Sequence, residues 1–204
     1  TPAVSAVAAI DFRCVGHDPV FLCIDVIGNV SDNAPQFNHP SPVQEFRMFD
    51  INDYLIDQTG KDWGQLLSDW AALLPEDFTV WMVNRFGDVF VVFDDGSVHM
   101  LDVGAGTITQ VAESREDFGE RIGVGDNLND WLLVPVVNFC VANGLRLGPD
   151  QCYGCKVPPV LGGQYSLDNI APIDLAVHYA FAAQIWQQTK DLAEGTKIRS
   201  VTLE

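Results

Sequence analysis

Basic residues are scarce in this sequence: 11 Lys and Arg stand against 28 Asp and Glu, which gives a formal net charge of −17. A chain with this charge repels nucleic-acid phosphates and anionic lipids, so we expect it to bind neither nucleic acid nor membrane. The same field attracts a basic protein partner and accelerates the encounter. High acidity also serves solubility alone, and the charge by itself does not separate these two interpretations.

Long apolar runs are absent too. No stretch of about 18 apolar residues occurs, so we expect no membrane-spanning helix. The opening TPAVSAVAAIDF has no basic residue before its apolar run, and Asp11 interrupts that run, so we expect no signal peptide. The five cysteines form no regular disulfide framework, which fits a reducing cytoplasm. With 48% apolar residues, the 204-residue chain still has enough for one sizeable core.

Motifs of the common enzyme classes are also missing, including GxSxG, the Walker loop, GxGxxG and HExxH. Cys152 and Cys155 have C-x-x-C spacing, but no second ligand pair for zinc follows, and two prolines block the helix that a thioredoxin-like site needs. His99 is near Asp102 in sequence, but strand alternation places their side chains on opposite faces. We expect no metal, no cofactor and no catalysis. An enzyme that uses Cys152 and Cys155, or His99, stays open as an alternative.

The predicted fold class is α+β, an antiparallel β-meander sheet with helices packed against it, plus an N-terminal β-hairpin. Residues 1–44 contain the hairpin and a connector, and we expect them to pack on the main domain, residues 45–204. The strands of that domain are TVWMVNRF, GDVFVVFD, SVHMLDV and TITQVA, joined by glycine turns. Because VFVVF hardly alternates, we expect that strand to be covered on both faces.

Helical periodicity appears on either side of these strands. An apolar stripe over residues 63–74 predicts a helix that ends at Pro75. After the strands, Ser114 opens another helix, and Asp117 follows three residues later in a capping-box arrangement.

Two longer helices are predicted in the second half of the chain. One runs over about residues 127–143, where Pro135 kinks it or marks its real start and Gly144 stops it. The other begins at residue 173 and ends near residue 192. The closing KIRSVTL is predicted to form a strand.

The stretch from Cys152 to Ile170, CYGCKVPPVLGGQYSLDNI, has the least ordinary composition of the chain. Two adjacent prolines fix φ and lack an N–H, and the two adjacent glycines permit positive φ or a close backbone approach. This composition predicts a conformationally restricted loop.

A series of short sequences keeps its order and spacing from about residue 60 to the end. It comprises W-x2-LLP, FGDVFV, DDGSVHMLD, TITQVAES-x-x-DF, WLL-x-P, GL-x-L-GPDQCYG-x-K-x-PPVLGG-x-Y-x-x-DN and VHYAFAAQIWQQTKDLAEGTKI. The series resembles the C-terminal domain of immunity proteins from type VI secretion effector–immunity pairs. CYGCKVPPVLGG and QIWQQ are the most specific parts of the likeness. A relation to the SUKH-type immunity superfamily is weaker.

This resemblance implies a protein that binds and neutralises a cognate toxin, often a nuclease, without catalysis or cofactor. A nuclease site is commonly basic, so we expect an acidic face to cover the toxin's active cleft in a stoichiometric complex. The expected contact residues are acids of the meander and the capped helix, with two tryptophans as anchors: Asp94, Asp95, Asp102, Glu113, Glu116, Asp117, Trp81 and Trp186. Taken singly, each of them is more typical of scaffold or solvated surface than of a contact residue. An adaptor or chaperone that loads an effector without blocking it is the alternative.

Overall fold

The computed structural model describes residues 50–193, 196, 198 and 200–202. The chain divides into two units, Thr1–Asp53 and Tyr54–Glu204. The predicted N-terminal hairpin and the predicted boundary after residue 44 lie outside the described residues and stay predictions. The first described element is a short 3-10 helix, η1 (Ile51–Tyr54). No helix of the described residues is long and apolar enough to cross a membrane.

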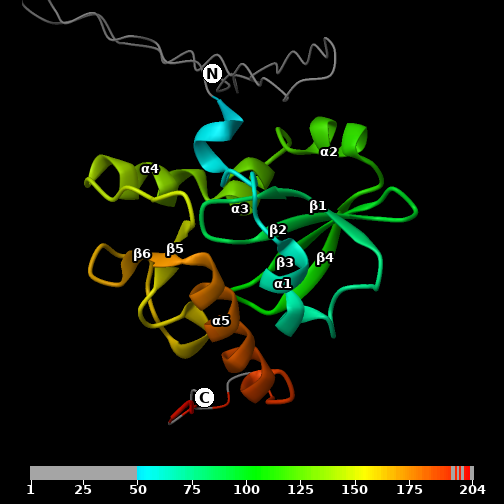
Figure 1. Cartoon of the computed structure of the whole chain (residues 1–204). Helices are drawn as coiled ribbons and strands as arrows, with labels where there is room; N and C mark the ends of the chain where they lie inside the picture. The colour runs from blue at the N-terminus through cyan, green and yellow to red at the C-terminus, as the bar shows by residue number, and fades with distance from the viewer. Residues whose placement is uncertain (1–49, 194–195, 197, 199, 203–204) are drawn as a thin grey trace, which may run out of the picture. The chain divides into compact units, whose positions relative to one another are not determined.

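A four-stranded antiparallel sheet forms the centre of the second unit (Figure 1). Its strands pair in the order in which they occur in the chain: β1 (Phe78–Val83), β2 (Val89–Phe93), β3 (Val98–Asp102) and β4 (Thr107–Ala112). Glycines with positive φ occupy the three connections, as the glycine turns of the sequence predict. The predicted α+β fold with an antiparallel meander is therefore confirmed.

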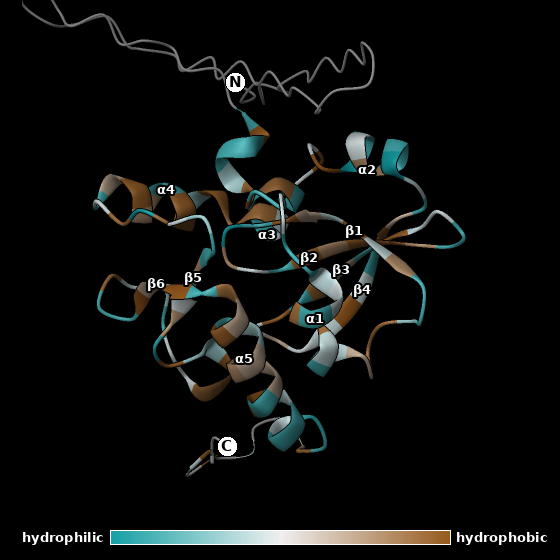
Figure 2. Cartoon of the chain, viewed as in Figure 1, coloured by the Kyte–Doolittle hydropathy of each residue, from teal (hydrophilic) through white to brown (hydrophobic). Residues whose placement is uncertain are grey.

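Strand β2 is covered on both faces, as its unbroken apolar run predicts. Val89, Phe90 and Val91 are all fully buried. Successive side chains of a strand point to opposite faces. Val89 and Val91 join the main apolar core with Tyr179, whereas Phe90 meets Phe118 with ring centroids 5.5 Å apart. Figure 2 shows the apolar colouring of the central strands that this double coverage requires.

Different helices cover the two faces of the sheet. Helix α5 (Leu175–Thr189), α1 (Trp63–Leu66) and the 3-10 helix η2 (Ser68–Trp70) pack around the main apolar core. Helix α2 (Arg115–Arg121) covers the other face through Phe118 (Figure 1). The sheet is thus the middle layer of this unit.

The helix predicted over residues 63–74 is only partly present. Helical structure stops after residue 66 and resumes as one 3-10 turn, because Gly64, Ser68 and Asp69 are poor helix formers. The apolar stripe still reaches the core, where Leu67 and Trp70 are buried. The apolar side chains are therefore buried as predicted, although the segment is not one continuous helix.

The predicted cap of helix α2 is confirmed. The Ser114 hydroxyl accepts a hydrogen bond from the Asp117 N–H at 3.2 Å, and the Asp117 carboxylate accepts one from the Glu113 N–H at 2.8 Å. These bonds satisfy two backbone donors at the start of the helix.

The helix predicted over residues 127–143 consists of two helices, α3 (Asn127–Leu132) and α4 (Val134–Ala142). Pro135 has no N–H to give to the Trp131 carbonyl, and its ring would clash with that carbonyl in a continuous helix. The chain therefore breaks at Leu133, which adopts the left-handed conformation with φ +52°. The side-chain amide of Asn84 donates to the Trp131 carbonyl at 3.0 Å in place of the missing donor. Gly144, with φ +83°, follows the end of α4 as predicted.

A second, two-stranded antiparallel sheet was not predicted. Its strands, β5 (Gln151–Cys155) and β6 (Ile170–Asp174), take both ends of the stretch that was expected to be a loop, which is left with residues 156–169. Helix α5 consequently begins at Leu175, two residues later than predicted. The predicted closing strand is wrong for the part of residues 197–203 that the structure describes, since none of it is in a strand.

A buried polar turn, Asn84–Asp88, connects β1 to β2. The Asn84 side-chain oxygen accepts hydrogen bonds from the N–H groups of Phe86 at 2.9 Å and Asp88 at 3.0 Å. Its amide nitrogen donates to the Asp88 carboxylate at 2.8 Å as well as to the Trp131 carbonyl. All the side-chain capacity of one buried asparagine is therefore used to shape the turn and to fix α3 to it.

The same turn is bonded to segments far away in the sequence. The Arg85 N–H donates to the Tyr54 carbonyl at 3.0 Å, and the Arg85 carbonyl accepts from the Tyr153 N–H at 2.8 Å. The second of these bonds attaches β5 to the end of β1.

Two further bonds join the turn to β3 and α5. The Asp88 carboxylate accepts from the Val103 N–H at 3.0 Å, and the Gly87 carbonyl accepts from the Tyr179 hydroxyl at 2.9 Å. Both sheets, α3 and α5 therefore meet at the Asn84–Asp88 turn.

We expect Asn84→Ala to lower the free energy of unfolding by about 3 kcal/mol, because it leaves several buried polar groups without partners. Urea unfolding of the full chain measures this loss. Asn143→Ala is the matched control, since that exposed amide makes one hydrogen bond, to the Phe139 carbonyl at 2.8 Å. It should cost less than about 1 kcal/mol. Equal losses in the two variants would contradict the central role of the turn.

Candidate functional site

The eight residues predicted to contact a partner lie in two places. Six of them are on or near one end of the four-stranded sheet and the capped helix beside it: Trp81, Asp94, Asp95, Glu113, Glu116 and Asp117. The other two, Asp102 and Trp186, line a cleft that adjoins the opposite end of the sheet. The structure therefore does not unite them in one surface.

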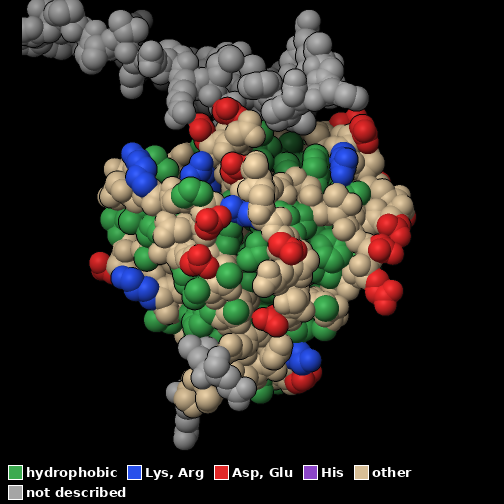
Figure 3. Space-filling view, in the orientation of Figure 1, with side chains coloured by type: hydrophobic (Ala, Val, Ile, Leu, Met, Phe, Trp, Pro, Cys, Tyr) green, Lys and Arg blue, Asp and Glu red, His purple; other side chains and the backbone are tan. Residues whose placement is uncertain are grey.

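The strand register explains the first group. Phe78 pairs with Phe93 and Val98 pairs with Ala112, so the residues before β1, in the β2–β3 turn and after β4 share one end of the sheet. This pairing brings together five exposed acids, which we call the acidic edge: Glu76, Asp77, Asp94, Asp95 and Glu113. Figure 3 shows acidic side chains at the right-hand edge of the view, beyond the β2–β3 turn.

The acidic edge takes no part in the ion pairs of the described residues. These pairs are Lys61–Asp150 and Asp117–Arg121, and neither involves one of its five residues. The Asp95 carboxylate accepts a hydrogen bond from the Ser97 N–H at 2.9 Å, and this bonding to Ser97 lowers the pKa of Asp95. Sequence reasoning missed Glu76 and Asp77, which join the edge only through strand pairing.

Two of the predicted contact residues have roles in the scaffold. Asp117 caps α2 and is paired with Arg121 at 2.8 Å. The Trp81 ring packs edge-on against Phe118 with centroids 5.1 Å apart, and the Arg115 guanidinium lies 5.5 Å from its centre. Glu116 is exposed in the first turn of α2.

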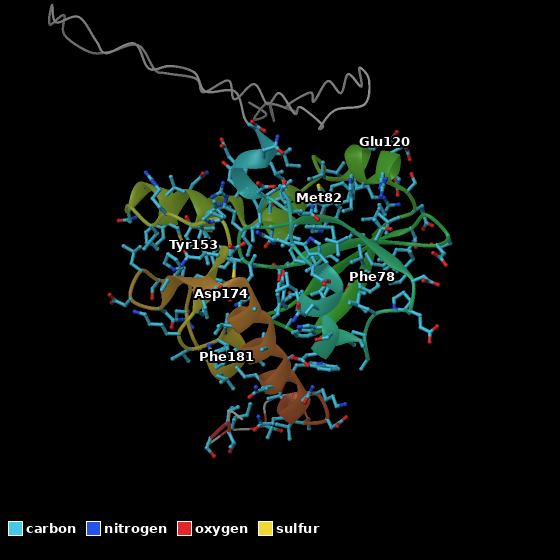
Figure 4. All side chains as sticks on the ribbon, in the orientation of Figure 1. Phe78, Met82, Glu120, Tyr153, Asp174 and Phe181 are labelled. Atoms are coloured by element: carbon cyan, nitrogen blue, oxygen red, sulfur yellow. The ribbon has the colours of Figure 1, made fainter. Side chains whose placement is uncertain are left out.

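The cleft has a volume of about 120 Å³. Its walls are the β3–β4 turn, the end of α3, β5 with the loop 156–169, and α5. Tyr153 and Phe181, labelled in Figure 4, belong to the walls formed by β5 and α5. Three carboxylates and five aromatic rings are among the groups that line the cleft: Asp88, Asp102 and Asp130, with Phe86, Tyr153, Tyr165, Phe181 and Trp186.

Trp186 is a fixed wall of this cleft. Its ring stacks on Trp70 with centroids 5.6 Å apart, and the Lys190 ammonium lies 5.1 Å from its centre. A Cβ atom on Gly106 would lie 2.2 Å from the Trp186 ring, so only glycine permits this approach.

Asp88 lies at the buried base of the cleft. Burial and the neighbouring Asp102 carboxylate raise the pKa of Asp88 to about 7, although its bonds to Asn84 and Val103 act in the opposite direction. Burial, with Asp88 as a further cause, also raises the pKa of Tyr165 to about 12. Sequence reasoning treated Asp88 as a turn residue, yet an acid directly before a fully apolar strand was the signal that could have identified it.

His178 of α5 also lines the cleft. Its ring lies against Gly87 and Gly154, where a Cβ atom would come within 2.9 Å and 3.4 Å of it. Burial lowers the pKa of His178 to about 4, against a smaller effect of a backbone hydrogen bond at Phe86. Its Nε2 atom is buried without a hydrogen-bond partner among the described residues. Sequence reasoning took this histidine for a scaffold residue.

The cysteines are not arranged for joint chemistry. Cys152 and Cys155 are three residues apart on β5, so their side chains point to opposite faces of the hairpin. Burial raises the pKa of the thiols of Cys140, Cys152 and Cys155, which disfavours the reactive thiolate. Within the described ranges no group of three His, Cys, Asp or Glu residues is placed to hold a metal ion.

His99 belongs to a different environment from Asp102. Its ring stacks on Phe93 with centroids 3.9 Å apart, and its Nε2 lies 3.0 Å from the Ser97 hydroxyl. These contacts are at the end of the sheet that carries the acidic edge.

The loop 156–169 is held in a defined shape, as its composition predicts. The Asn169 side chain bonds both the N–H and the carbonyl of Val157, each at 2.8 Å, and the Gln164 carbonyl at 2.9 Å. Between them lies a short 3-10 helix, η3 (Pro159–Leu161). The loop exposes four large apolar side chains beside the cleft: Val157, Val160, Tyr165 and Leu167.

The close packing of this loop predicts that alanine at Gly163 lowers stability far more than alanine at a glycine in open space. A Cβ atom on Gly163 would lie 1.7 Å from the Val157 carbonyl oxygen, a backbone atom that cannot move alone. We expect Gly163→Ala to lower the free energy of unfolding by more than about 2 kcal/mol. Gly119→Ala in α2 meets nothing within 4 Å and should be neutral or stabilising, by up to about 1 kcal/mol. Thermal unfolding of both variants is the measurement, and a similar Tm for the two would contradict this account.

Asp88 and His178 predict opposite effects of pH on stability. The pKa of Asp88 is raised from 3.8 to about 7, so its stabilising contribution is complete below pH 3.8 and is lost as the pH rises to 7. The pKa of His178 is lowered from 6.5 to about 4, so its contribution is complete above pH 6.5 and is lost as the pH falls to 4. Between pH 4 and 6.5 the two groups change the free energy of unfolding with pH in opposite directions, and the two effects cancel.

We therefore expect a variant that lacks one of the two groups to show how the other group changes stability with pH. From pH 6.5 to 4, Asp88→Asn should lose stability and His178→Asn should gain it, each by about 1.4 kcal/mol per pH unit. The unmodified chain and the double variant should change little from these two groups. Urea unfolding at several pH values in this window checks the signs, and parallel curves for all four proteins would overturn them.

Comparison with known proteins gives one family. Residues 112–186 match the family model described as T6SS immunity protein Tdi1, C-terminal. The match runs from the end of β4 to α5 and includes both strands of the second sheet and the loop 156–169. It falls within the longer range, from about residue 60 to the end, over which the sequence resembles such proteins.

Other comparisons add little. No curated protein matches the chain. Among solved structures, the crystal structure of Atu4351 from Agrobacterium tumefaciens is similar with 17% identity and a TM-score of 0.39, over 59% of this chain and 62% of that one. The chain thus spans less than two thirds of that protein's length. Over residues 112–186, this chain is thus similar to the C-terminal domain of the T6SS immunity protein Tdi1.

Proposed function

We propose that this protein neutralises a toxin of a type VI secretion system by forming a one-to-one complex that covers the toxin's active site. The observation that carries the proposal is the match of residues 112–186 to the T6SS immunity family. An immunity protein needs a toxin partner, and it acts by binding rather than by turnover. The toxin's class, a nuclease or another enzyme that acts on nucleic acid, is part of the proposal.

The charge distribution supports a basic partner. The chain has a formal net charge of −17, and the acidic edge presents five exposed carboxylates at one end of the sheet. An enzyme that holds phosphates needs a basic active site, and the field of this chain would steer such a site toward it. The attraction between exposed charges weakens as salt is added.

An adaptor that loads an effector into the secretion machinery would also bind a toxin. It differs in where it binds, because an adaptor leaves the active site open. The activity of the toxin in the purified complex therefore separates the two functions. An enzyme based on Cys152 and Cys155 is less well supported, since the two thiols point to opposite faces and burial raises the pKa of both.

We expect the full chain, co-expressed with the toxin domain encoded beside its gene, to restore the growth of cells that the toxin alone kills. The two proteins should co-purify at a molar ratio of one to one, and the toxin in the complex should be inactive. Plating, light scattering and a toxin assay measure these outcomes. A complex with full toxin activity would favour the adaptor. Absence of both rescue and complex would overturn the proposal for that toxin.

The acidic edge offers a matched test of steering. The variant Asp94→Asn/Asp95→Asn/Glu113→Gln keeps side-chain size and removes three exposed charges. It should lower the association rate constant and its dependence on salt, and leave the dissociation rate nearly unchanged. A change confined to the dissociation rate would assign the edge to direct contact instead.

A further inference from the structure

We propose that the cleft between β5, α5 and the β3–β4 turn receives a single arginine side chain that projects from the toxin. This inference rests on the proposed function and adds to it the chemical group that the immunity protein recognises. It is carried by three observations on the cleft: unpaired carboxylates, aromatic walls and a buried polar atom without a partner.

The carboxylates lack a cation. Asp88, Asp102 and Asp130 line one cavity, and no Lys or Arg of the described residues forms an ion pair with any of them. Lys190 lies near the cleft but is placed over the Trp186 ring. After burial, the charge of Asp102 is a cause of the raised pKa of Asp88, so the two carboxylates repel each other in this space. A cation that entered this space would remove the repulsion.

The hydrogen bonds of the carboxylates also leave room for a donor. Asp102 accepts from the Ala105 N–H at 2.7 Å through Oδ1, which leaves Oδ2 available to a further donor. A carboxylate accepts several hydrogen bonds through its two oxygens. A guanidinium group offers five N–H donors in one plane, which is why arginine matches such an arrangement better than lysine.

The aromatic walls favour the same group. Tyr165 is half-exposed at the mouth of the cleft, and its ring meets Phe86 edge-on with centroids 5.8 Å apart. Phe181 and Trp186 form the opposite wall on α5. A guanidinium plane stacks on aromatic faces, and the attraction increases when water is excluded.

His178 supplies the independent observation. It lines the cleft, its pKa keeps it neutral at physiological pH, and its Nε2 atom is buried with no partner among the described residues. Buried polar atoms are nearly always hydrogen-bonded in native proteins, so an atom without a partner on a residue that lines the cleft supports a ligand there. A neutral imidazole can accept a hydrogen bond from a guanidinium N–H.

The size and rim of the cleft agree with a side chain rather than a metal ion or a larger molecule. The volume of about 120 Å³ accommodates a few water molecules, comparable to one planar side-chain head group. Within the described part of the chain no group of three acidic, histidine or cysteine residues is placed to hold a metal. The exposed apolar residue Val160 is part of the lining, where a protein partner would exclude water.

The first experiment uses the full chain without toxin. N-acetyl-argininamide is titrated into isotopically labelled protein, and amide and indole shifts are followed by NMR. We expect saturable shifts at Gly104–Gly106 and at the Trp186 indole, none at the acidic edge, and their loss in Asp102→Asn. Asparagine at this position keeps the bond to Ala105, so the variant should remain folded, which thermal unfolding checks. Shifts of equal size at the acidic edge, or no saturable shift at the cleft, would overturn the inference.

The second experiment uses the toxin and charge-matched variants. Each variant removes two carboxylates. The cleft variant is Asp102→Asn/Asp130→Asn, and the edge variant is Asp94→Asn/Asp95→Asn. The cleft variant should weaken toxin binding by about tenfold or more, through a faster dissociation, whereas the edge variant should mainly slow association. Tyr165→Ala, which removes an aromatic wall and no charge, should also speed dissociation.

The outcomes separate the two proposals. If the unmodified chain forms a complex and the two double variants dissociate at the same rate, the cleft inference fails and the proposed function stands. If the unmodified chain forms no complex at all, the proposed function fails, and the argininamide titration still decides whether the cleft binds a guanidinium.

Discussion

The buried hydrogen bonds of the Asn84–Asp88 turn are the constraint on which the rest of the second unit depends. This turn is the only place where both sheets, α3 and α5 are bonded to the same few described residues. The break at Pro135 frees the Trp131 carbonyl, and Asn84 supplies the donor that the proline lacks. Without Asn84 the Trp131 carbonyl would lack a donor, and without the helix break the Asn84 amide would lack this acceptor. Either change would be destabilising, because it would leave a polar group without its partner.

The same turn brings the Asp88 carboxylate into the interior. Asp88 stabilises the fold and also lines the cleft that is proposed to bind a cation. Asp88 accepts the hydrogen bond of the Val103 N–H, but it is buried and the charge of Asp102 acts on it. The bonds from Asn84 and Val103 offset only part of the cost of burying the charge, as the raised pKa of Asp88 shows. A cation in the cleft and a proton on Asp88 relieve the same repulsion, so they compete. Binding of a cation in the cleft, as proposed, would consequently be linked to pH through the residue that also organises the fold.

Local signals in the sequence predicted local structure well. The Ser114 cap, the glycine turns of the meander and the helix stop at Gly144 depend on residues a few positions apart, and all three are present. The helix over residues 63–74 failed because periodicity records which side chains are buried, not whether Gly64 and Ser68 keep the backbone helical. The hairpin of β5 and β6 escaped prediction because fourteen residues, 156–169, separate its strands. The cleft draws on segments from Phe86 to Thr189, and only the fold brings them together.

A net charge of −17 alone cannot explain how an immunity protein would choose its toxin. Exposed carboxylates such as those of the acidic edge act at a distance on any basic protein, and salt screens them. They can raise the rate of encounter, but they discriminate poorly between one basic surface and another. Discrimination requires a place where a wrong partner leaves buried groups unsatisfied. The cleft has that property, because the Nε2 atom of His178 has no hydrogen-bond partner among the described residues and Asp102 has no ion pair there. In the proposed complex, the field of the whole chain would govern the rate of association, and the geometry of one small cleft would govern the rate of dissociation.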